Sequence, residues 1–239
     1  MKNIAVIGVG NWGKNLVREF NKLSNILFYC NLNNKTNSEW LKNNYPHIKS
    51  NSFNSIISDS TIDAVVIATP INTHFELAKK ALSLGKHVFV EKPITHSYET
   101  AKKLEALALK NKQILFVGQI FLFHEVFKKL MKLNEEILSI EIIWNKFGTF
   151  KEDIFYNLGI HAISITNSLL GNFKKSKIIF ADDNKITAEI EYPNSFAILK
   201  IDRLSNKKQF EVNIKTKERE YLWLKDKLFL KKNKEYELL

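Results

Sequence analysis

A glycine-rich turn directly after the first apolar run constrains the fold more than any other feature of this sequence. Residues 3–7 (NIAVI) are typical of a buried strand, and Gly8-Val9-Gly10-Asn11-Trp12-Gly13 leads from them into a segment of helical spacing. The three glycines permit a tight bend, a close approach of the backbone to a pyrophosphate, and close packing of helix on strand. The helix N-terminus then faces the anion. The turn predicts a dinucleotide site at Gly8, Gly10, Asn11, Trp12 and Gly13.

The alternation that begins at this turn continues over the first 118 residues. Short β-branched runs, typical of parallel strands buried on both faces, alternate with longer segments of helical spacing. The predicted strands are Asn3–Ile7, Ile26–Cys30, Ala64–Ala68, His87–Val90 and Ile114–Val117, and the predicted helices are Trp12–Leu23, Ser38–Asn43, Thr73–Leu84 and Ser97–Asn111. The order predicts an α/β fold in which residues 1–118 form a dinucleotide-binding Rossmann domain with a doubly wound parallel sheet.

The pattern changes after Gly118, so we place a domain boundary there. Helices are predicted at Glu125–Leu133 and Ile160–Leu170, and alternating polar and apolar residues predict strands at Ile137–Trp144, Lys177–Phe180, Thr187–Tyr192, Phe196–Ile201, Phe210–Lys215 and Glu220–Leu224. Residues 119–239 are therefore predicted to form a second domain, of the α+β class, with a mostly antiparallel sheet. One face of this sheet is expected to be covered, and the other to be solvated or used in assembly.

The composition excludes several classes of protein. The formal net charge is +11, but among the 36 basic residues only Arg18, Arg203 and Arg219 are arginine, and the lysines are spread along the chain. Surfaces that bind nucleic acid favour arginine, and no motif of interleaved basic and aromatic residues occurs, so no nucleic-acid partner is predicted. The histidines lack the spacing of metal ligands, and no metal is predicted.

The same composition indicates a cytoplasmic protein. The single Cys30 cannot form an internal disulfide, which fits a reducing compartment. No stretch approaches the roughly 18 uninterrupted apolar residues of a membrane span, and the strand that starts at Asn3 leaves no room for a signal segment. Cytoplasmic location without a membrane partner is therefore expected.

Asn31 occupies the position that should decide between NAD and NADP. An acidic residue is expected at the end of the second strand, where its carboxylate accepts hydrogen bonds from the adenosine ribose. An asparagine still bonds a hydroxyl but does not repel a 2′-phosphate, and Lys35 lies just beyond it. The cofactor is therefore predicted to be NAD or NADP, with NADP tolerated or preferred.

Two further motifs follow predicted strands, at the sheet edge where open α/β sheets bind ligands. They are Ala68-Thr69-Pro70-Ile71-Asn72-Thr73-His74 and Glu91-Lys92-Pro93, and with the glycine turn they resemble the Gfo/Idh/MocA family of NAD(P)-dependent oxidoreductases. The resemblance implies a cis bond before Pro93. It also implies that the cofactor is bound by Ala68, Thr69, Pro70, Asn72, His74, Glu91, Lys92 and Gln119; Asn72 and His74 are equally consistent with helix caps.

The resemblance continues past the boundary. Val117-Gly118-Gln119 leads into the FLFHEVF segment, and Asp153 to His161 opens a helix. His161 matches the family histidine at the floor of the substrate site, and His124 is a further candidate for substrate contact. Asn157 stands where the family often has an aspartate; its amide cannot take up a proton but can hydrogen-bond the substrate.

The implied activity is hydride transfer between a nicotinamide and a sugar hydroxyl or ketone, with Lys92 and His161 as the catalytic acid/base candidates and Lys92 the stronger. The segments 117–127 and 148–165 resemble members that oxidise nucleotide sugars.

Three hypotheses stay open: a sugar or sugar-nucleotide dehydrogenase, a reductase of an imine or a linear tetrapyrrole, and a cofactor-binding protein without turnover. The third is motivated by Asn31, Asn157 and a C-terminal domain shorter than is usual in the family. The family also implies that residues 119–239 are a substrate-binding and oligomerisation domain, with a homo-oligomer assembled through the C-terminal sheet.

Overall fold

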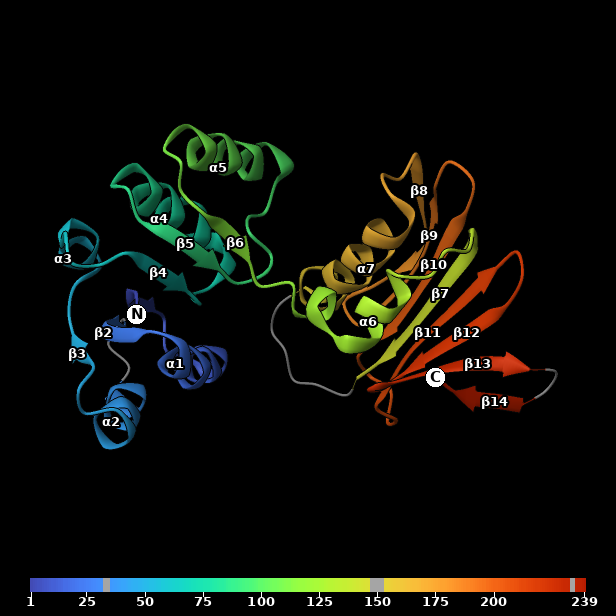
Figure 1. Ribbon diagram of the computed structural model, residues 1–239, viewed down its shortest axis with the longest axis horizontal. Helices are drawn as coiled ribbons and strands as arrows, with labels where there is room; N and C mark the ends of the chain where they lie inside the picture. Colours follow the sequence, from blue (N-terminus) through green and yellow to red (C-terminus); the bar gives the residue numbers. More distant parts are fainter. Residues whose placement is uncertain (32–34, 147–152, 233–234) are drawn as a thin grey trace. The chain divides into compact units, whose positions relative to one another are not determined.

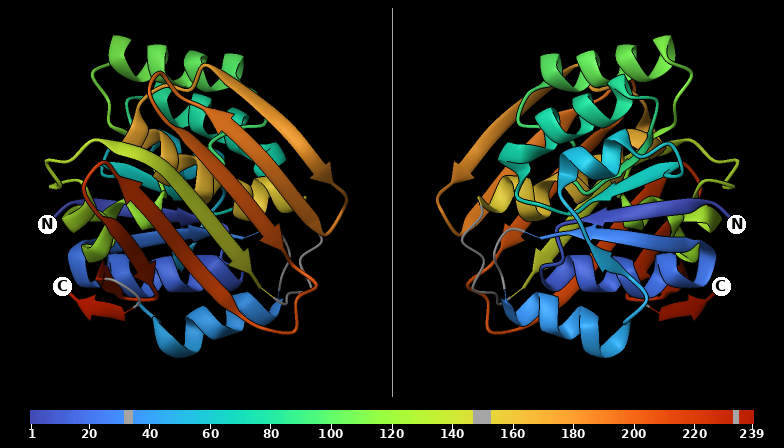
Figure 2. Two further views of the ribbon diagram at one scale, coloured as in Figure 1. Left: turned by 90° about the vertical axis from the view of Figure 1, so that its right-hand side faces the viewer. Right: turned by 90° about the vertical axis from the view of Figure 1, so that its left-hand side faces the viewer.

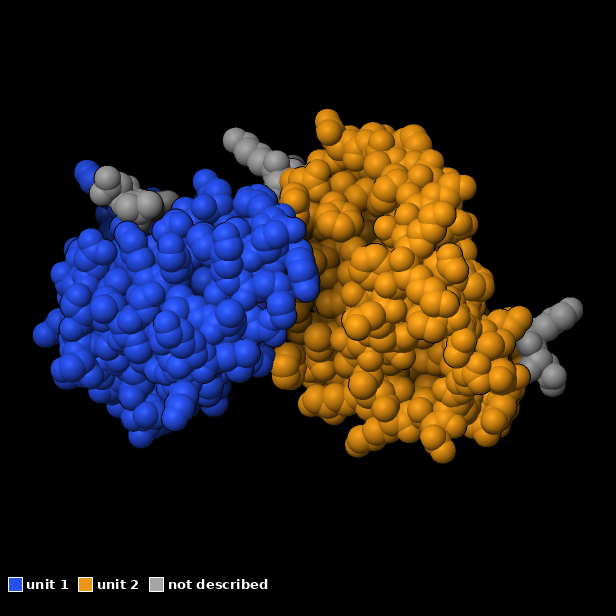
Figure 3. Space-filling view, turned by 90° about the horizontal axis from the view of Figure 1, so that it is seen from above, with its two compact units in different colours: residues 1–118 blue, residues 119–239 orange. Residues whose placement is uncertain are grey.

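The computed structural model describes residues 1–31, 35–146, 153–232 and 235–239. The chain divides into two compact units, Met1–Gly118 and Gln119–Leu239, which are coloured separately in Figure 3. Residues 148–152, part of the segment that resembles nucleotide-sugar enzymes, lie outside the described residues. No helix in the described ranges is long and apolar enough to cross a membrane.

The first unit is built on a six-stranded sheet in which every pairing is parallel (Figure 1). The strand order is β3-β2-β1-β4-β5-β6. The strands are β1 (Asn3–Ile7), β2 (Asn25–Cys30), β3 (Lys49–Ser50), β4 (Ala64–Ile67), β5 (His87–Val90) and β6 (Leu115–Val117). The helices are α1 (Asn11–Leu23), α2 (Lys35–Asn44), α3 (Phe53–Ser58), α4 (Ile71–Ser83) and α5 (Tyr98–Lys110).

Helices cover both faces of this sheet. Alternate residues of β1 point to opposite faces: Ile4 and Val6 pack in one apolar cluster with side chains of α1 and α2, and Ala5 and Ile7 pack in another with side chains of α3, α4 and α5. A strand buried on both faces needs an uninterrupted apolar run, and this is why the NIAVI run predicted it. The doubly wound parallel sheet predicted from the sequence is confirmed.

The second unit is built on an eight-stranded sheet of order β14-β13-β12-β11-β7-β10-β9-β8 (Figure 2, left). Its pairings are antiparallel except that of β7 with β10. The strands are β7 (Ile137–Asn145), β8 (Lys175–Ala181), β9 (Lys185–Glu191), β10 (Phe196–Asp202), β11 (Gln209–Thr216), β12 (Glu220–Leu224), β13 (Lys227–Lys232) and β14 (Glu235–Leu238). The mostly antiparallel sheet predicted from the sequence is confirmed.

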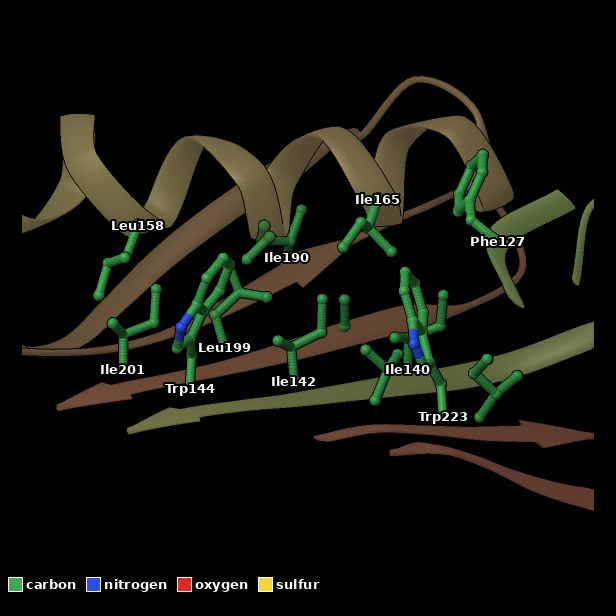
Figure 4. Close-up of a cluster of buried hydrophobic side chains, with 14 of the residues drawn as sticks. Phe127, Ile140, Ile142, Trp144, Leu158, Ile165, Ile190, Leu199, Ile201 and Trp223 are labelled. Atoms are coloured by element: carbon green, nitrogen blue, oxygen red, sulfur yellow. The ribbon is translucent and has the colours of Figure 1, made fainter. Parts of the chain in front are cut away.

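Two helices, α6 (Glu125–Leu130) and α7 (Ile160–Leu170), cover one face of this sheet. A 3-10 turn, η1 (Ile120–Phe123), precedes α6, and a π-helical turn, η2 (Phe155–Gly159), precedes α7. Figure 4 shows Leu158 and Ile165 pointing from the helical layer toward Ile142 and Ile201 of the sheet. The opposite face is more polar: Lys200 pairs there with Glu141 of the neighbouring strand, 2.7 Å apart.

Candidate functional site

The glycine turn packs directly against the end of β4. Gly8 has a φ of +89°, which few residues besides glycine adopt, and a Cβ placed on it would lie 2.7 Å from the Ala68 carbonyl oxygen. A Cβ on Gly13 would lie 2.2 Å from the Gly8 carbonyl oxygen. The Gly8 amide donates to the Cys30 carbonyl at the end of β2. Gly8 and Gly13 are therefore required by packing within the protein itself.

Gly10 is glycine for a different reason. A Cβ placed there would meet nothing within 4 Å, so no contact inside the protein excludes a side chain. Gly10 also occupies the N-cap position of α1, where it supplies no capping side chain, and the first turn holds no acidic residue. The first-turn amides and the positive end of the helix dipole thus suit an anion. The open side of Gly10 leaves room for such a group, and the residues present fit a pyrophosphate.

Glu91 lies buried at the end of β5, close to the glycine turn. The Lys92 amide donates a hydrogen bond to its Oε2 at 3.3 Å. Its Oε1 is buried without a hydrogen-bond partner among the described residues, and a Cβ on Gly118 would come within 2.8 Å of this atom. Burial raises the pKa of Glu91, and the nearby Trp12 indole and the Lys92 amide oppose this shift. The structure thus brings three predicted site residues together: Trp12, Glu91 and Lys92.

The turn after β4 is held by side chains of its own. The hydroxyls of Thr69 and Thr73 lie 2.6 Å apart, and the Thr73 hydroxyl donates to the Pro70 carbonyl at 2.7 Å. Pro70 is the N-cap residue of α4, and Asn72 is exposed in the first turn of that helix without being its N-cap. The next segment contains the cis bond between Lys92 and Pro93 that the resemblance implied. Lys92 is half-buried.

His74 lies between these two segments rather than at the surface. It is 1% exposed, and its ring nitrogens lie 2.8 Å from the carbonyl oxygens of Pro93 and Thr69. Both ring nitrogens thus face oxygen atoms of the protein backbone.

The end of β2 carries no acidic side chain. Asn31 follows β2 and is half-buried, and the exposed Lys35 begins α2. Lys14 and Arg18 of α1 each lie 5.3 Å from the ring centre of Trp40 on α2. These groups give the α1 and α2 side of the unit a positive character.

In the second unit, His161 lies in the first turn of α7, directly after the π-helical turn η2. Asn157 lies within that turn, and both residues are buried. Asp153 caps the turn, because its carboxylate accepts hydrogen bonds from the amides of Phe155 and Tyr156. π-Helical turns are rare in proteins, and those that occur are often found at functional sites. This turn is a signal that the sequence analysis missed.

Aromatic rings enclose His161. The Trp144 ring is stacked on the imidazole at 5.7 Å between centres, and the Phe121 ring meets it edge-on at 5.1 Å. Phe121 also contacts Phe210, at 5.0 Å. The sequence analysis did not select these aromatic residues, although Phe121 lies only two positions after Gln119.

His124 and Gln119 begin two short helices. The Nδ1 atom of His124 accepts the Val126 amide at 3.2 Å and so caps α6, and its ring lies 5.1 Å from Trp223. Gln119 is the N-cap residue of η1, and its carbonyl accepts the Leu122 amide. A cavity of about 260 Å³ in this unit includes Ser168 to Leu170 at the C-terminal end of α7, but none of the predicted site residues lines it.

Comparison with known proteins identifies the first unit. Residues 2–119 match the family model of the Gfo/Idh/MocA oxidoreductases, an oxidoreductase family with an NAD-binding Rossmann fold. The uncharacterized oxidoreductase YhhX of Escherichia coli is 30% identical over 181 residues, which are 67% of this chain and 52% of that protein. The UDP-N-acetylglucosamine 3-dehydrogenase of Acidithiobacillus ferrooxidans is 27% identical over 175 residues, 70% of this chain and 53% of that protein. The matched part thus spans about half the length of these relatives.

Solved structures extend the likeness of the fold to the second unit. A structure of the A. ferrooxidans 3-dehydrogenase superposes with a TM-score of 0.91 at 22% identity, covering 99% of this chain and 82% of that one. A biliverdin reductase from Synechocystis, in complex with biliverdin and NADP+, superposes with a TM-score of 0.83 at 18% identity, covering 99% and 84%. At such identities the comparison establishes the fold alone.

Proposed function

Because this chain belongs to the Gfo/Idh/MocA oxidoreductase family, we propose that it transfers a hydride between a nicotinamide cofactor and a carbon of a sugar or sugar nucleotide. The observation that carries this proposal is the open glycine turn at the N-terminus of α1, which suits a pyrophosphate. This turn packs against Ala68 at the end of β4, and β4 is the parallel neighbour of β5, the strand that leads to Lys92. A lysine near a dinucleotide site can move the proton that accompanies hydride transfer.

The cofactor is held mainly by backbone groups of the first unit. Gly8, Gly10 and Gly13 shape the turn, and the amides of Asn11 and Trp12 lie at the helix end that suits the pyrophosphate. The turns at Ala68 to Pro70 and at Glu91 and Lys92 line the nicotinamide side, together with Gln119. When bound, the oxidised nicotinamide accepts the hydride that leaves the substrate carbon.

Lys92 moves the proton that accompanies the hydride. Its neutral amine accepts the proton of the reacting hydroxyl while the carbon loses its hydride, and the C–O bond becomes a carbonyl. In the reverse direction the ammonium group returns this proton to the developing alkoxide. A general acid or base of this kind typically contributes a factor of about 10²–10⁴ to the rate.

His161 and Asn157 of the second unit bind the substrate. Asn157 offers an amide that donates and accepts hydrogen bonds but holds no transferable proton. His161 is fixed between Trp144 and Phe121, which sets the direction of its ring nitrogens. We assign His161 the orientation of the reacting hydroxyl and a share in proton transfer. His124 caps a helix through Nδ1, which leaves Nε2 as its only ring nitrogen for a substrate contact.

NADP is the proposed cofactor, in preference to NAD. Asn31 lacks the charge that would repel a 2′-phosphate, and Lys35 begins the helix that follows. The cations Lys14 and Arg18 on the neighbouring α1 add to the positive potential on this side.

A nucleotide sugar is the proposed substrate class. Support comes from the relative named as a UDP-N-acetylglucosamine 3-dehydrogenase. The two other hypotheses, reduction of an imine or tetrapyrrole and cofactor binding without turnover, predict different results in the assay below.

The proposal includes cytoplasmic location and a homo-oligomer formed through the second sheet, at whose edge β8 lies. Every residue of β8 is exposed, including Ile178, Ile179 and Phe180, each about half exposed or more. Light scattering should give at least twice the monomer mass of 27.8 kDa. A monomer at all concentrations contradicts this part of the proposal.

The decisive test begins with cofactor binding. NADPH and NADH are titrated into the purified protein while tryptophan fluorescence is followed, since Trp12 lies in the glycine turn and is 45% exposed. UDP-N-acetylglucosamine and biliverdin are then offered with the bound nicotinamide in its oxidised or reduced form. Turnover of the sugar nucleotide supports the proposal, turnover of biliverdin alone supports the second hypothesis, and binding without turnover of any substrate supports the third. Failure to bind either nicotinamide overturns the proposal.

A further inference from the structure

One buried histidine joins the two segments to which the nicotinamide side of the site is assigned. His74 is the fourth residue of α4, and its Nδ1 and Nε2 lie 2.8 Å from the carbonyl oxygens of Pro93 and Thr69. Thr69 follows β4 and Pro93 follows β5, and these strands are parallel neighbours in the sheet. A single imidazole therefore spans the two turns that leave adjacent strand ends.

The geometry leaves His74 no part in direct ligand binding. Both ring nitrogens face backbone oxygens, and the side chain is 1% exposed. The ring does not cap α4 either, because Pro70 occupies the N-cap and the hydroxyl of Thr73 bonds the Pro70 carbonyl. The remaining role is to connect the two turns.

The chemistry of the ring defines this connection. Carbonyl oxygens only accept hydrogen bonds, so the ring must donate, and a neutral imidazole has one N–H. Burial lowers the pKa of His74, and the charge of His96 lowers it further, while the hydrogen bonds to Pro93 and Thr69 oppose the shift. A ring with a proton on each nitrogen donates to both carbonyls, and a neutral ring donates to one of them and fills the space beside the other.

We propose that His74 is a positioning residue, which fixes the spacing between the Thr69 turn and the segment that carries Lys92. This role rests on the proposed function, because Lys92 directly precedes the Pro93 carbonyl that His74 holds. Displacement of a reacting group by about 1 Å costs roughly 10²-fold in rate, so a residue that touches no ligand has a large effect on turnover.

The first test needs no substrate or cofactor. In His74→Phe an aromatic ring is kept but both ring nitrogens are lost, so hydrogen exchange of the free protein should become faster in the peptides that cover 69–75 and 91–97. His74→Gln keeps one donor group, and exchange should become faster in only one of the two segments. The matched control is His47→Phe, a substitution of an exposed histidine of the same unit that contacts Asn21. Unchanged exchange in both His74 variants overturns the proposal.

The second test separates positioning from ligand contact. With NADP+ and UDP-N-acetylglucosamine, we expect His74→Phe to lower kcat about 10- to 100-fold and to change the NADPH dissociation constant, measured by binding alone, less than about threefold, with kcat partly restored in His74→Gln. A loss of NADPH affinity that equals the loss of kcat/KM makes His74 a direct ligand and overturns the proposal. If the wild-type protein turns over no substrate, the proposed function fails, and the exchange experiment still decides the role of His74. If His74→Phe does not fold, His74→Gln carries both measurements.

Discussion

The two units present their candidate site residues in different ways. In the first unit the ligand surface is mostly backbone at strand ends: an open glycine turn, a helix N-terminus and carbonyls bridged by His74. In the second unit it is made of side chains on α7, where His161 is packed against rings from the sheet and from η1. A backbone site depends on a few residues close in sequence, and a side-chain site depends on packing between distant elements. Mutations should therefore affect the two units differently.

The largest effect should come from Lys92, the one proposed proton carrier in the first unit. Lys92→Met removes the amine and keeps the chain length, so we expect kcat to fall by about 10³-fold, in the range of a lost general acid or base. The NADPH dissociation constant should stay within about threefold, because the glycine turn is unaltered. Lys103→Met, on the exposed surface of α5, is the control. Turnover that equals the control removes Lys92 from the mechanism.

The glycine turn offers a test of the backbone site. Gly10→Ala places a Cβ where nothing in the protein lies within 4 Å, and Gly10→Val adds two methyl groups to it, so stability should be nearly unchanged while NADPH affinity of Gly10→Val falls by about 10- to 100-fold, a cost of roughly 1.4–2.8 kcal/mol. Gly13→Ala, in contrast, should lower the stability of the protein. Its Cβ meets the Gly8 carbonyl at 2.2 Å, and we expect destabilisation by about 1–3 kcal/mol.

Thermal melting and fluorescence titration separate the two substitutions. If Gly10→Val binds NADPH as the wild type does, the pyrophosphate does not approach this turn, and the first unit loses its assigned ligand. A strong loss of melting temperature in Gly10→Val contradicts the open space found beside Gly10.

His161 tests whether the second unit takes part in the reaction. We expect His161→Gln to lower kcat by about 10- to 100-fold, less than Lys92→Met, because an amide still orients a hydroxyl but transfers no proton. In a double-mutant cycle with Lys92→Met, the combined loss should be smaller than the product of the single losses if both residues act on one hydroxyl. The control is His47→Gln. Fully multiplicative losses indicate that His161 acts independently of Lys92.

The difference between sites built from residues close in sequence and sites built from distant elements also explains which parts of the fold the sequence predicted. The parallel sheet and its glycine turn follow from uninterrupted apolar runs and glycine spacing, which are local signals. The sequence analysis missed β3 and α3, which have two and six residues, because such short elements carry little periodicity. It also missed β13 and β14, whose lysines and glutamates hide the alternation.

The candidate site shows the same limit. Motifs selected Lys92 and His161, but the rings around His161 come from segments far apart in the chain, Phe121, Trp144 and Phe210. For His74 the sequence left a cap and a ligand as equal alternatives. Its contact with Pro93 joins residues 19 positions apart, and only the pairing of β4 with β5 brings them together.

A smaller effect is expected at the end of β2. Asn31→Asp introduces a carboxylate where the 2′-phosphate of NADPH is proposed to bind, and repulsion should weaken NADPH about tenfold, or roughly 1.4 kcal/mol, while NADH binds equally well or better. Asn54→Asp, on the exposed surface of α3 in the same unit, is the control. Equal affinities of Asn31→Asp and the parent for both nucleotides contradict the assignment of Asn31 to cofactor choice.

The smallest effect concerns stability and the buried carboxyl of Glu91 at the end of β5. Burial raises the pKa of Glu91 in the folded protein, so the folded state binds this proton more tightly than the unfolded chain does. The resulting stabilisation is fully present below the ordinary pKa of glutamate and is lost as the pH rises through the raised value. Glu91→Gln cannot lose a proton, so it should melt above the wild type by about 2–4 °C near pH 8, the shift produced by about 1 kcal/mol, and the difference should shrink toward about pH 4. Glu76→Gln, on the exposed face of α4, should show no such trend. If the difference in melting temperature between Glu91→Gln and the wild type is the same at every pH in this range, the prediction is wrong. Glu91 then ionises as freely in the folded state as in the unfolded chain.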